Sequence, residues 1–188
     1  MPRRTNRQAN TNTPKPKLIV IDTSIFCLYF DISGKNTHET ETPASVKETI
    51  ERETEAGAKM VLPFAVIIET GNHIAHISDG NIRRTKVHEF TTFVTDCLDG
   101  KNPWIPFNGQ DSLYTLDKMK ELLEKWKGRA ISGDSIGDVS ITAIAEFYAG
   151  AMPNYEVLIY TLDKGLRAYS PSPANELLIV PAPPRRKK

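Results

Sequence analysis

Short apolar runs alternate with longer segments of helical periodicity along the middle of the chain. The short runs are rich in aliphatic and β-branched residues and bounded by turn residues, which is typical of strands buried on both faces; they cover 18–21, 60–62, 157–161 and 177–180. Apolar residues recur at helical spacing over 23–30, 43–56, 64–77, 79–98, 111–126 and 138–149. The alternation predicts an α/β fold, a three-layer α/β/α sandwich with a central, mainly parallel sheet.

The helix expected over 64–77 has one acidic residue, Glu69. At 100° per residue, the apolar face is predicted to comprise Phe64, Ile67, Ile68, Gly71, Ile74 and Ala75. Glu69, His73 and His76 fall on the opposite side, so Glu69 is expected to line a cleft. No Cys or further His stands at a spacing that completes a zinc site with the two histidines, which favours an ordinary polar helix face.

Four acidic residues stand at or within these hydrophobic segments. Asp22 closes the run 18–21, Glu69 lies after the second strand, Asp138 opens an apolar helix, and Asp163 follows the third strand. Strand ends of a parallel sheet meet at one edge, so these acids can share a site. Clustered carboxylates repel one another unless a cation joins them, and Mg²⁺ or Mn²⁺ is the natural cation for oxygen ligands. Such a site indicates metal-assisted phosphodiester hydrolysis.

Each acid also has an ordinary local interpretation. Asp22 and Asp163 suit turns, Asp138 can pair with Ser135 at a helix start, and Glu69 can be solvated. Asp134 lies four residues before Asp138 and is the alternative to it as a ligand. The joint order of the four acids along one α/β pattern favours the shared site. No glycine-rich phosphate loop follows the first strand, which argues against a dinucleotide cofactor.

The charge is distributed unevenly over the 188 residues. Residues 1–17 have five basic residues and no acid, and 181–188 have four basic residues and no acid. The other 15 Lys and Arg share the middle with all 23 acids, giving it a net charge of −8. Basic tails on an acidic body suit a polyanionic ligand, or they only keep the protein soluble. No apolar run approaches the roughly 20 residues of a membrane span, and the N-terminus has no secretory h-region.

The acids and their neighbours resemble the motifs of PIN-domain ribonucleases. The matching segments, in order, are IDTSIF (21–26), VIIET (66–70), GDVSITAIA (137–145) and YTLDKGL (160–166). The resemblance implies a PIN-like nuclease domain over 17–180, between a disordered basic tail (1–16) and a basic Pro-rich tail (181–188). It also implies Mg²⁺ or Mn²⁺ held by Asp22, Glu69, Asp138 and Asp163, with Asp134 as the alternative. Ser24 and Thr161 would orient carboxylates or metal-bound water.

The same resemblance implies an endoribonuclease acting on single-stranded RNA. The cations available to grip phosphates are Arg83, Arg84 and Lys164. Many small PIN proteins are toxins, so an antitoxin protein and a second copy of the chain are candidate partners; an RNA-processing or defence nuclease is the other possibility. We expect a cytoplasmic protein that contacts no membrane, with Cys27 and Cys97 as free thiols. The alternative is a non-catalytic PIN-like scaffold that binds RNA or protein.

Overall fold

A three-stranded parallel sheet forms the centre of the fold. The structure is a computed structural model that describes residues 15–107 and 110–172. Strands β1 (Lys17–Ile21), β2 (Lys59–Val61) and β3 (Glu156–Tyr160) lie in the order β2-β1-β3. Central β1 pairs on both edges, so residues 18–21 are fully buried. The predicted α/β class and parallel sheet are confirmed.

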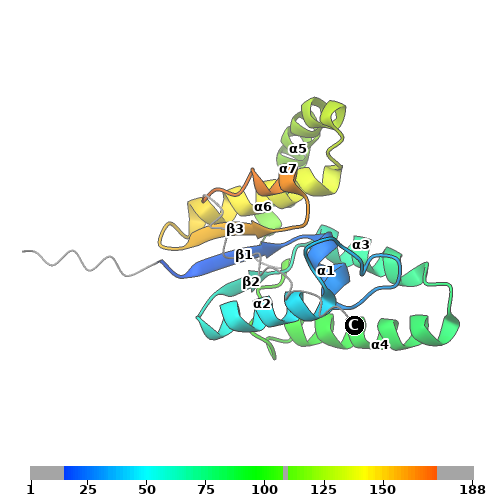
Figure 1. The fold of residues 1–188 in the computed structure, drawn as a ribbon. Coiled ribbons are helices and arrows are strands. Elements are labelled where there is room, and N and C mark those ends of the chain that lie inside the picture. The colour runs from blue at the N-terminus through cyan, green and yellow to red at the C-terminus, as the bar shows by residue number, and fades with distance from the viewer. Residues whose placement is uncertain (1–14, 108–109, 173–188) are drawn as a thin grey trace, which may run out of the picture.

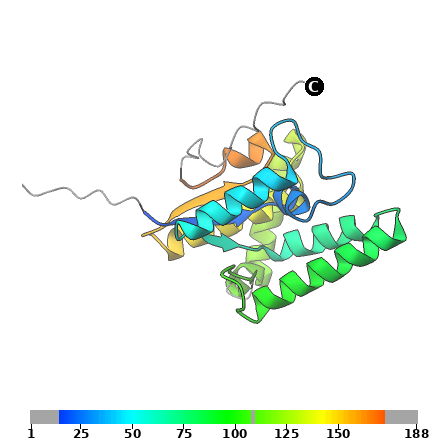
Figure 2. The same cartoon turned by 60° about the horizontal axis from the view of Figure 1, so that its bottom comes forward.

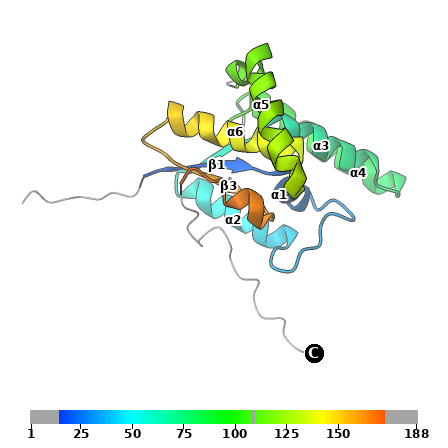
Figure 3. The same cartoon turned by 90° about the horizontal axis from the view of Figure 1, so that it is seen from above.

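Helices lie on both sides of this sheet. In the described residues there are seven α-helices: α1 (Thr23–Tyr29), α2 (Pro43–Glu55), α3 (Phe64–Ala75), α4 (Gly80–Leu98), α5 (Leu116–Arg129), α6 (Ile136–Ala151) and α7 (Lys164–Arg167). Two short 3₁₀ helices, η2 (Asp111–Tyr114) and η3 (Ala130–Ser132), flank α5. Figure 3 shows α6 on one side of the sheet and α2 with α7 on the other. This arrangement is compatible with the three-layer sandwich expected.

An aromatic cluster holds α1 against α4 and the segment that follows it. The ring of Phe26 lies 6.1 Å from that of Phe90 and 5.8 Å from that of Trp104, centroid to centroid. Phe93 meets Trp104 edge-on at 5.0 Å. Such contacts add to the free energy of burying large apolar side chains. They fix α1, whose first residues carry part of the candidate site described below.

Helices α3 and α4 form an antiparallel hairpin that extends beyond the sheet (Figure 2). The apolar face predicted for α3 was wrong in part, because Phe64 is 43% and Ile68 is 50% exposed. The buried residues are Val66, Thr70 and Ile74, of which only Ile74 was predicted for that face. The reason is that α3 packs against α1, α4 and α6, and the positions of these helices decide which side is covered.

The single helix expected over 111–126 is divided at Thr115. Its hydroxyl accepts a hydrogen bond from the Lys118 N–H, so Thr115 caps a new helix and separates η2 from α5. Helix α5 buries none of its residues and projects from the body of the domain (Figure 1). The helix expected over 138–149 begins two residues earlier, at Ile136, because Ser135 caps it.

Several sequence predictions lie outside the described residues: the strand at 177–180, most of the first basic tail and all of the second. The described chain ends beside β3, where the hydroxyls of Ser170 and Ser172 accept hydrogen bonds from the N–H groups of Ile159 and Val157. Within 15–107 and 110–172, no helix is long and apolar enough to cross a membrane. Cys27 and Cys97 are both buried free thiols, as predicted.

Candidate active site

A cavity of about 410 Å³ opens where β1 and β3 end, and all four predicted acids line it. Asp22 follows β1, Asp163 follows β3, Glu69 lies on α3, and Asp138 lies in the first turn of α6. The backbone N–H of Asp22 also donates to the Tyr160 carbonyl oxygen over 3.0 Å, which ties the two strand ends together. The structure thus brings these acids together, as the sequence predicted. Their role as metal ligands stays a prediction.

Asp22 is the most deeply buried of the four, with 6% of its surface exposed. Its Oδ2 accepts hydrogen bonds from the Ser24 hydroxyl, the Ser24 N–H at 3.3 Å and the Thr161 hydroxyl at 2.8 Å. Burial raises the pKa of Asp22, and these hydrogen bonds oppose the rise. No described cationic side chain forms an ion pair with it. A buried carboxylate without a cation is destabilising, so a bound cation would relieve the cost.

Ser24 and Thr161 occupy the positions at which the sequence predicted orienting donors. The Ser24 hydroxyl donates to Asp22 and accepts from the Leu162 N–H at 3.1 Å. The Thr161 hydroxyl likewise donates to Asp22 and accepts from the Asp163 N–H at 3.0 Å. The two hydroxyls therefore hold the Asp22 carboxylate against the turn that carries Asp163.

Glu69 is held by two residues that the sequence analysis missed. The Thr23 hydroxyl donates to Glu69 Oε2 over 2.6 Å. On the other side the carboxylate lies against Gly137, where an added Cβ would be 2.5 Å from Oε1. The sequence offered no clear signal for this contact, because Gly137 lies just before the helix expected over 138–149 and suits an ordinary turn there.

Asp138 completes the capping box that Ser135 begins at the start of α6, and Asp163 caps α7. Asp138 Oδ2 accepts from the Ser135 N–H at 2.7 Å, and the Ser135 hydroxyl accepts from the Asp138 N–H at 3.0 Å. Asp163 Oδ1 accepts from the N–H groups of Gly165 at 2.6 Å and Leu166 at 3.1 Å. The ordinary local interpretations thus hold for both acids. The second carboxylate oxygen of each residue, Oδ1 of Asp138 and Oδ2 of Asp163, accepts no hydrogen bond from the described residues. Both side chains line the cavity.

Asp134, the alternative ligand, lies outside the residues that line this cavity. Its Oδ2 accepts a hydrogen bond from the Arg129 Nε, and its carbonyl oxygen accepts one from the Trp126 indole at 3.1 Å. Arg129 also donates to the Thr142 hydroxyl at 3.1 Å and stacks on Tyr169 at 3.7 Å. Asp134 therefore holds the segment before α6 against the end of α5, and Arg129 joins α5 to α6. Between the two aspartates, only Asp138 belongs to the cavity.

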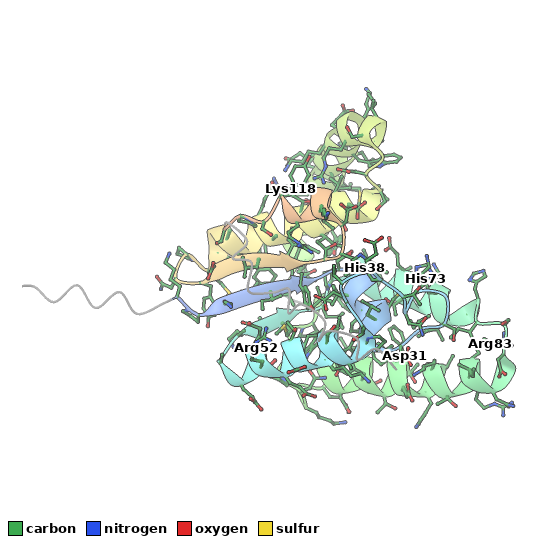
Figure 4. All side chains as sticks on the ribbon, viewed as in Figure 1. Asp31, His38, Arg52, His73, Arg83 and Lys118 are labelled. Carbon is green, nitrogen blue, oxygen red and sulfur yellow. The ribbon has the colours of Figure 1, made fainter. Side chains whose placement is uncertain are left out.

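The cations proposed for RNA lie elsewhere, with one exception close by. Arg83 donates to the Ile77 carbonyl oxygen at 2.7 Å at the far end of the α3–α4 hairpin, and exposed Arg84 follows it (Figure 4). Lys164 is exposed beside Asp163. The cavity is lined instead by Lys35 and His73. Burial, with the nearby charge of Lys35, lowers the pKa of His73, which favours a neutral imidazole at neutral pH.

The donor set fits a hard divalent cation by its chemistry, because four carboxylates line one cavity and Asp22 is buried without a countercharge. Gly137 adds to this fit by leaving space for the Glu69 carboxylate next to Asp138. Yet within the described ranges no group of three or more His, Cys, Asp or Glu side chains is arranged to hold a metal ion. To bind a metal ion, the carboxylates would have to change their side-chain conformations and give up some of their present hydrogen bonds.

Comparison of the chain with models of protein families, with curated proteins and with solved structures finds no significant match. The resemblance to PIN-domain ribonucleases therefore rests on the four motifs alone.

Proposed function

We propose that the protein is a PIN-like, Mg²⁺- or Mn²⁺-dependent endoribonuclease that hydrolyses phosphodiester bonds of single-stranded RNA. The observation that supports it best is the meeting of four acids from distant segments in one cavity at the carboxyl ends of parallel strands. Ligand sites of open α/β sheets lie at this edge. The burial of Asp22 without a cation adds to the argument, since such a group favours a positively charged ligand.

The chain's own residues would orient the reaction rather than supply a nucleophile. Bound metal would lower the pKa of a water molecule and neutralise charge on the leaving oxygen. Ser24 and Thr161 hold the Asp22 carboxylate, and Thr23 holds that of Glu69. Burial raises the pKa of Cys27 to about 11, so this cavity-lining thiol stays protonated and is a poor nucleophile at neutral pH.

The biological setting belongs to the same proposal and rests on the motif resemblance alone. A toxin neutralised by an antitoxin protein, acting in the cytoplasm as a monomer or homodimer, is one form of it. A stand-alone RNA-processing or defence nuclease is the other. Neither form changes the chemistry proposed for the cavity.

A non-catalytic scaffold that binds RNA or protein is the second candidate, and one observation favours it. Asp138 and Asp163 both stabilise the starts of helices through hydrogen bonds to the backbone, and the described acids are not arranged around a common metal position. On this interpretation the acids serve local structure and the cavity binds no cation.

Metal titration separates the two candidates. We expect Mg²⁺ or Mn²⁺ to raise the melting temperature of the wild-type protein, with saturation at about 100 times Kd worth about 2.7 kcal/mol. Asp22→Asn should abolish both this stabilisation and the cleavage of a labelled single-stranded RNA. The scaffold would be favoured if neither metal changes the melting temperature and the RNA stays intact after long incubation.

A further inference from the structure

The loop between α1 and α2 forms one wall of the candidate cavity through Gly34, Lys35 and Thr37. Its backbone has a defined local shape. Asp31 and Gly34 have φ values of 52° and 80°, and the Asn36 side chain donates to Asp31 Oδ1 at 2.8 Å. The Lys35 N–H donates to the carbonyl oxygen of fully buried Ile32 over 2.9 Å. These contacts fix the point from which the Lys35 side chain leaves the loop.

Lys35 has a positive charge that no other described residue neutralises. Its ammonium forms no ion pair or side-chain hydrogen bond with the residues in 15–107 and 110–172, although four carboxylates line the same cavity. Other lysines in the fold do pair: Lys86 with Glu89, Lys118 with Glu121 and Lys125 with Glu146.

The charge of Lys35 nevertheless affects the pKa of two side chains in the cavity. Burial is the main reason for the lowered pKa of His73 and the raised pKa of Cys27. Lys35 lines the same cavity as both of these side chains, and its charge adds to the first shift and opposes the second. Lys35 is thus a cation that forms no ion pair with the described residues, at the rim of an acidic cavity.

We infer that Lys35 binds a non-bridging phosphate oxygen of the RNA strand, which makes the α1–α2 loop the substrate-contact loop of the site. The inference rests on the proposed function. A cavity lined by four carboxylates repels a polyanion, and a lysine at its rim supplies local attraction where the scissile region must enter. A compact ammonium suits a phosphate oxygen and reads no base, so this contact would position RNA without selecting its sequence.

The test measures binding separately from cleavage. Asp22→Asn serves as the background, and binding of a fluorescein-labelled single-stranded RNA is followed in EDTA from low to high salt. Adding Lys35→Ala should weaken binding about tenfold, as expected for one lost charged contact, and reduce the salt slope by about 0.7. Lys35→Arg should restore most of the affinity, and the loss should be alike for oligo(U), oligo(A) and oligo(C).

Lys59 provides the matched control. It is exposed at the start of β2, the opposite end of the strands from the cavity, and forms no ion pair with described residues. Lys59→Ala removes the same charge but should leave affinity and salt slope within about twofold of the background. Equal effects of Lys35→Ala and Lys59→Ala would overturn the inference, because only net charge would then matter.

Steady-state kinetics distinguish this inference from the proposed function. With Asp22 intact, Lys35→Ala should raise KM for RNA and leave kcat nearly unchanged. If the wild type cleaves RNA and the kinetics of Lys35→Ala and Lys59→Ala are identical, the role of Lys35 is refuted. The proposed nuclease activity would still be supported. If the wild type cleaves no RNA with either metal but Lys35→Ala selectively weakens RNA binding, the proposed nuclease activity is refuted. The contact between Lys35 and RNA would still be supported.

Discussion

The carboxylate of Glu69 occupies the space in which a side chain at residue 137 would begin: a Cβ added to Gly137 would lie 2.5 Å from Glu69 Oε1. Helices α3 and α6 meet at this point. Because Gly137 has no side chain, the Glu69 carboxylate can lie against the first turn of α6, next to Asp138. The nearest atom belongs to the end of the flexible Glu69 side chain, and the Ser135 hydroxyl oxygen follows at 3.2 Å. A larger residue at 137 can therefore move these two side chains without disturbing the backbone.

Gly137→Ala should consequently displace the Glu69 carboxylate and impair the proposed activity while the fold persists. We expect metal affinity and RNA cleavage to fall by about 10- to 100-fold, the range seen when the support of a metal ligand is disturbed. Thermal unfolding should show unchanged or greater stability, because Ala is favoured over Gly in helices by up to about 1 kcal/mol.

Gly150 in the same helix is the control, since an added Cβ there meets nothing within 4 Å. Gly150→Ala should stabilise the protein by a similar amount and leave cleavage unchanged. If Gly137→Ala and Gly150→Ala behave alike in activity, the position of Glu69 does not matter for the reaction.

Replacing the buried Asp22 should change how stability depends on pH. Its pKa in the folded protein is raised by burial above the value of about 3.9 expected when unfolded. Between these two values the folded state binds more protons, so wild-type stability falls as pH rises through the folded pKa. Asp22→Asn removes this loss. In EDTA at pH 7 it should melt at an equal or higher temperature than the wild type, and the difference should vanish below about pH 4.

Glu48, exposed on α2 and without an ion pair among the described residues, is the control for this measurement. Glu48→Gln should follow the wild-type stability curve across pH 3.5–8. A lower melting temperature of Asp22→Asn at pH 7 in EDTA would mean that the charged carboxylate stabilises the metal-free fold.

The two aspartates near the start of α6 should separate activity from stability. Asp138→Asn keeps an acceptor for the Ser135 N–H but removes a charge from the cavity. It should abolish cleavage and cost only about 0.3–1 kcal/mol of stability through the helix dipole. Asp134→Asn should retain cleavage and cost about 1.5–3 kcal/mol, because it weakens the charged hydrogen bond from partly buried Arg129.

Denaturant unfolding and RNA cleavage measured on both variants provide the check. The reverse pattern, an inactive Asp134→Asn beside an active Asp138→Asn, would place the wrong aspartate in the site.

Thr23 should matter for activity because its hydroxyl holds Glu69 Oε2. Thr23→Val keeps the side-chain shape and removes that hydrogen bond, so we expect about tenfold slower cleavage with only a small change in stability. Thr49→Val is the matched control. Thr49 is fully buried on α2, and it does not line the cavity. That variant should cleave normally, and equal cleavage by both variants would remove Thr23 from the site.

Much of the architecture was predictable because it follows from local patterns. Short apolar runs such as 18–21 bury on both faces only as inner strands, and the helices between them make the sheet parallel. Parallel strands end at one edge, so the meeting of Asp22 with Asp163 was implied by their positions after β1 and β3. Boundaries were less certain, because caps such as those of Thr115 and Ser135 divide or extend a periodic segment.

By itself, then, the sequence determined the fold class, the order of strands and helices, and the edge at which four acids meet. Only the tertiary structure decided that Asp134 pairs with Arg129 while Asp138 lines the cavity, since their local patterns are alike. It also decided the contacts of Glu69 and the proximity of Lys35, which depend on helices and loops that are distant in sequence. Periodicity describes one element at a time, whereas burial and contact depend on which elements become neighbours.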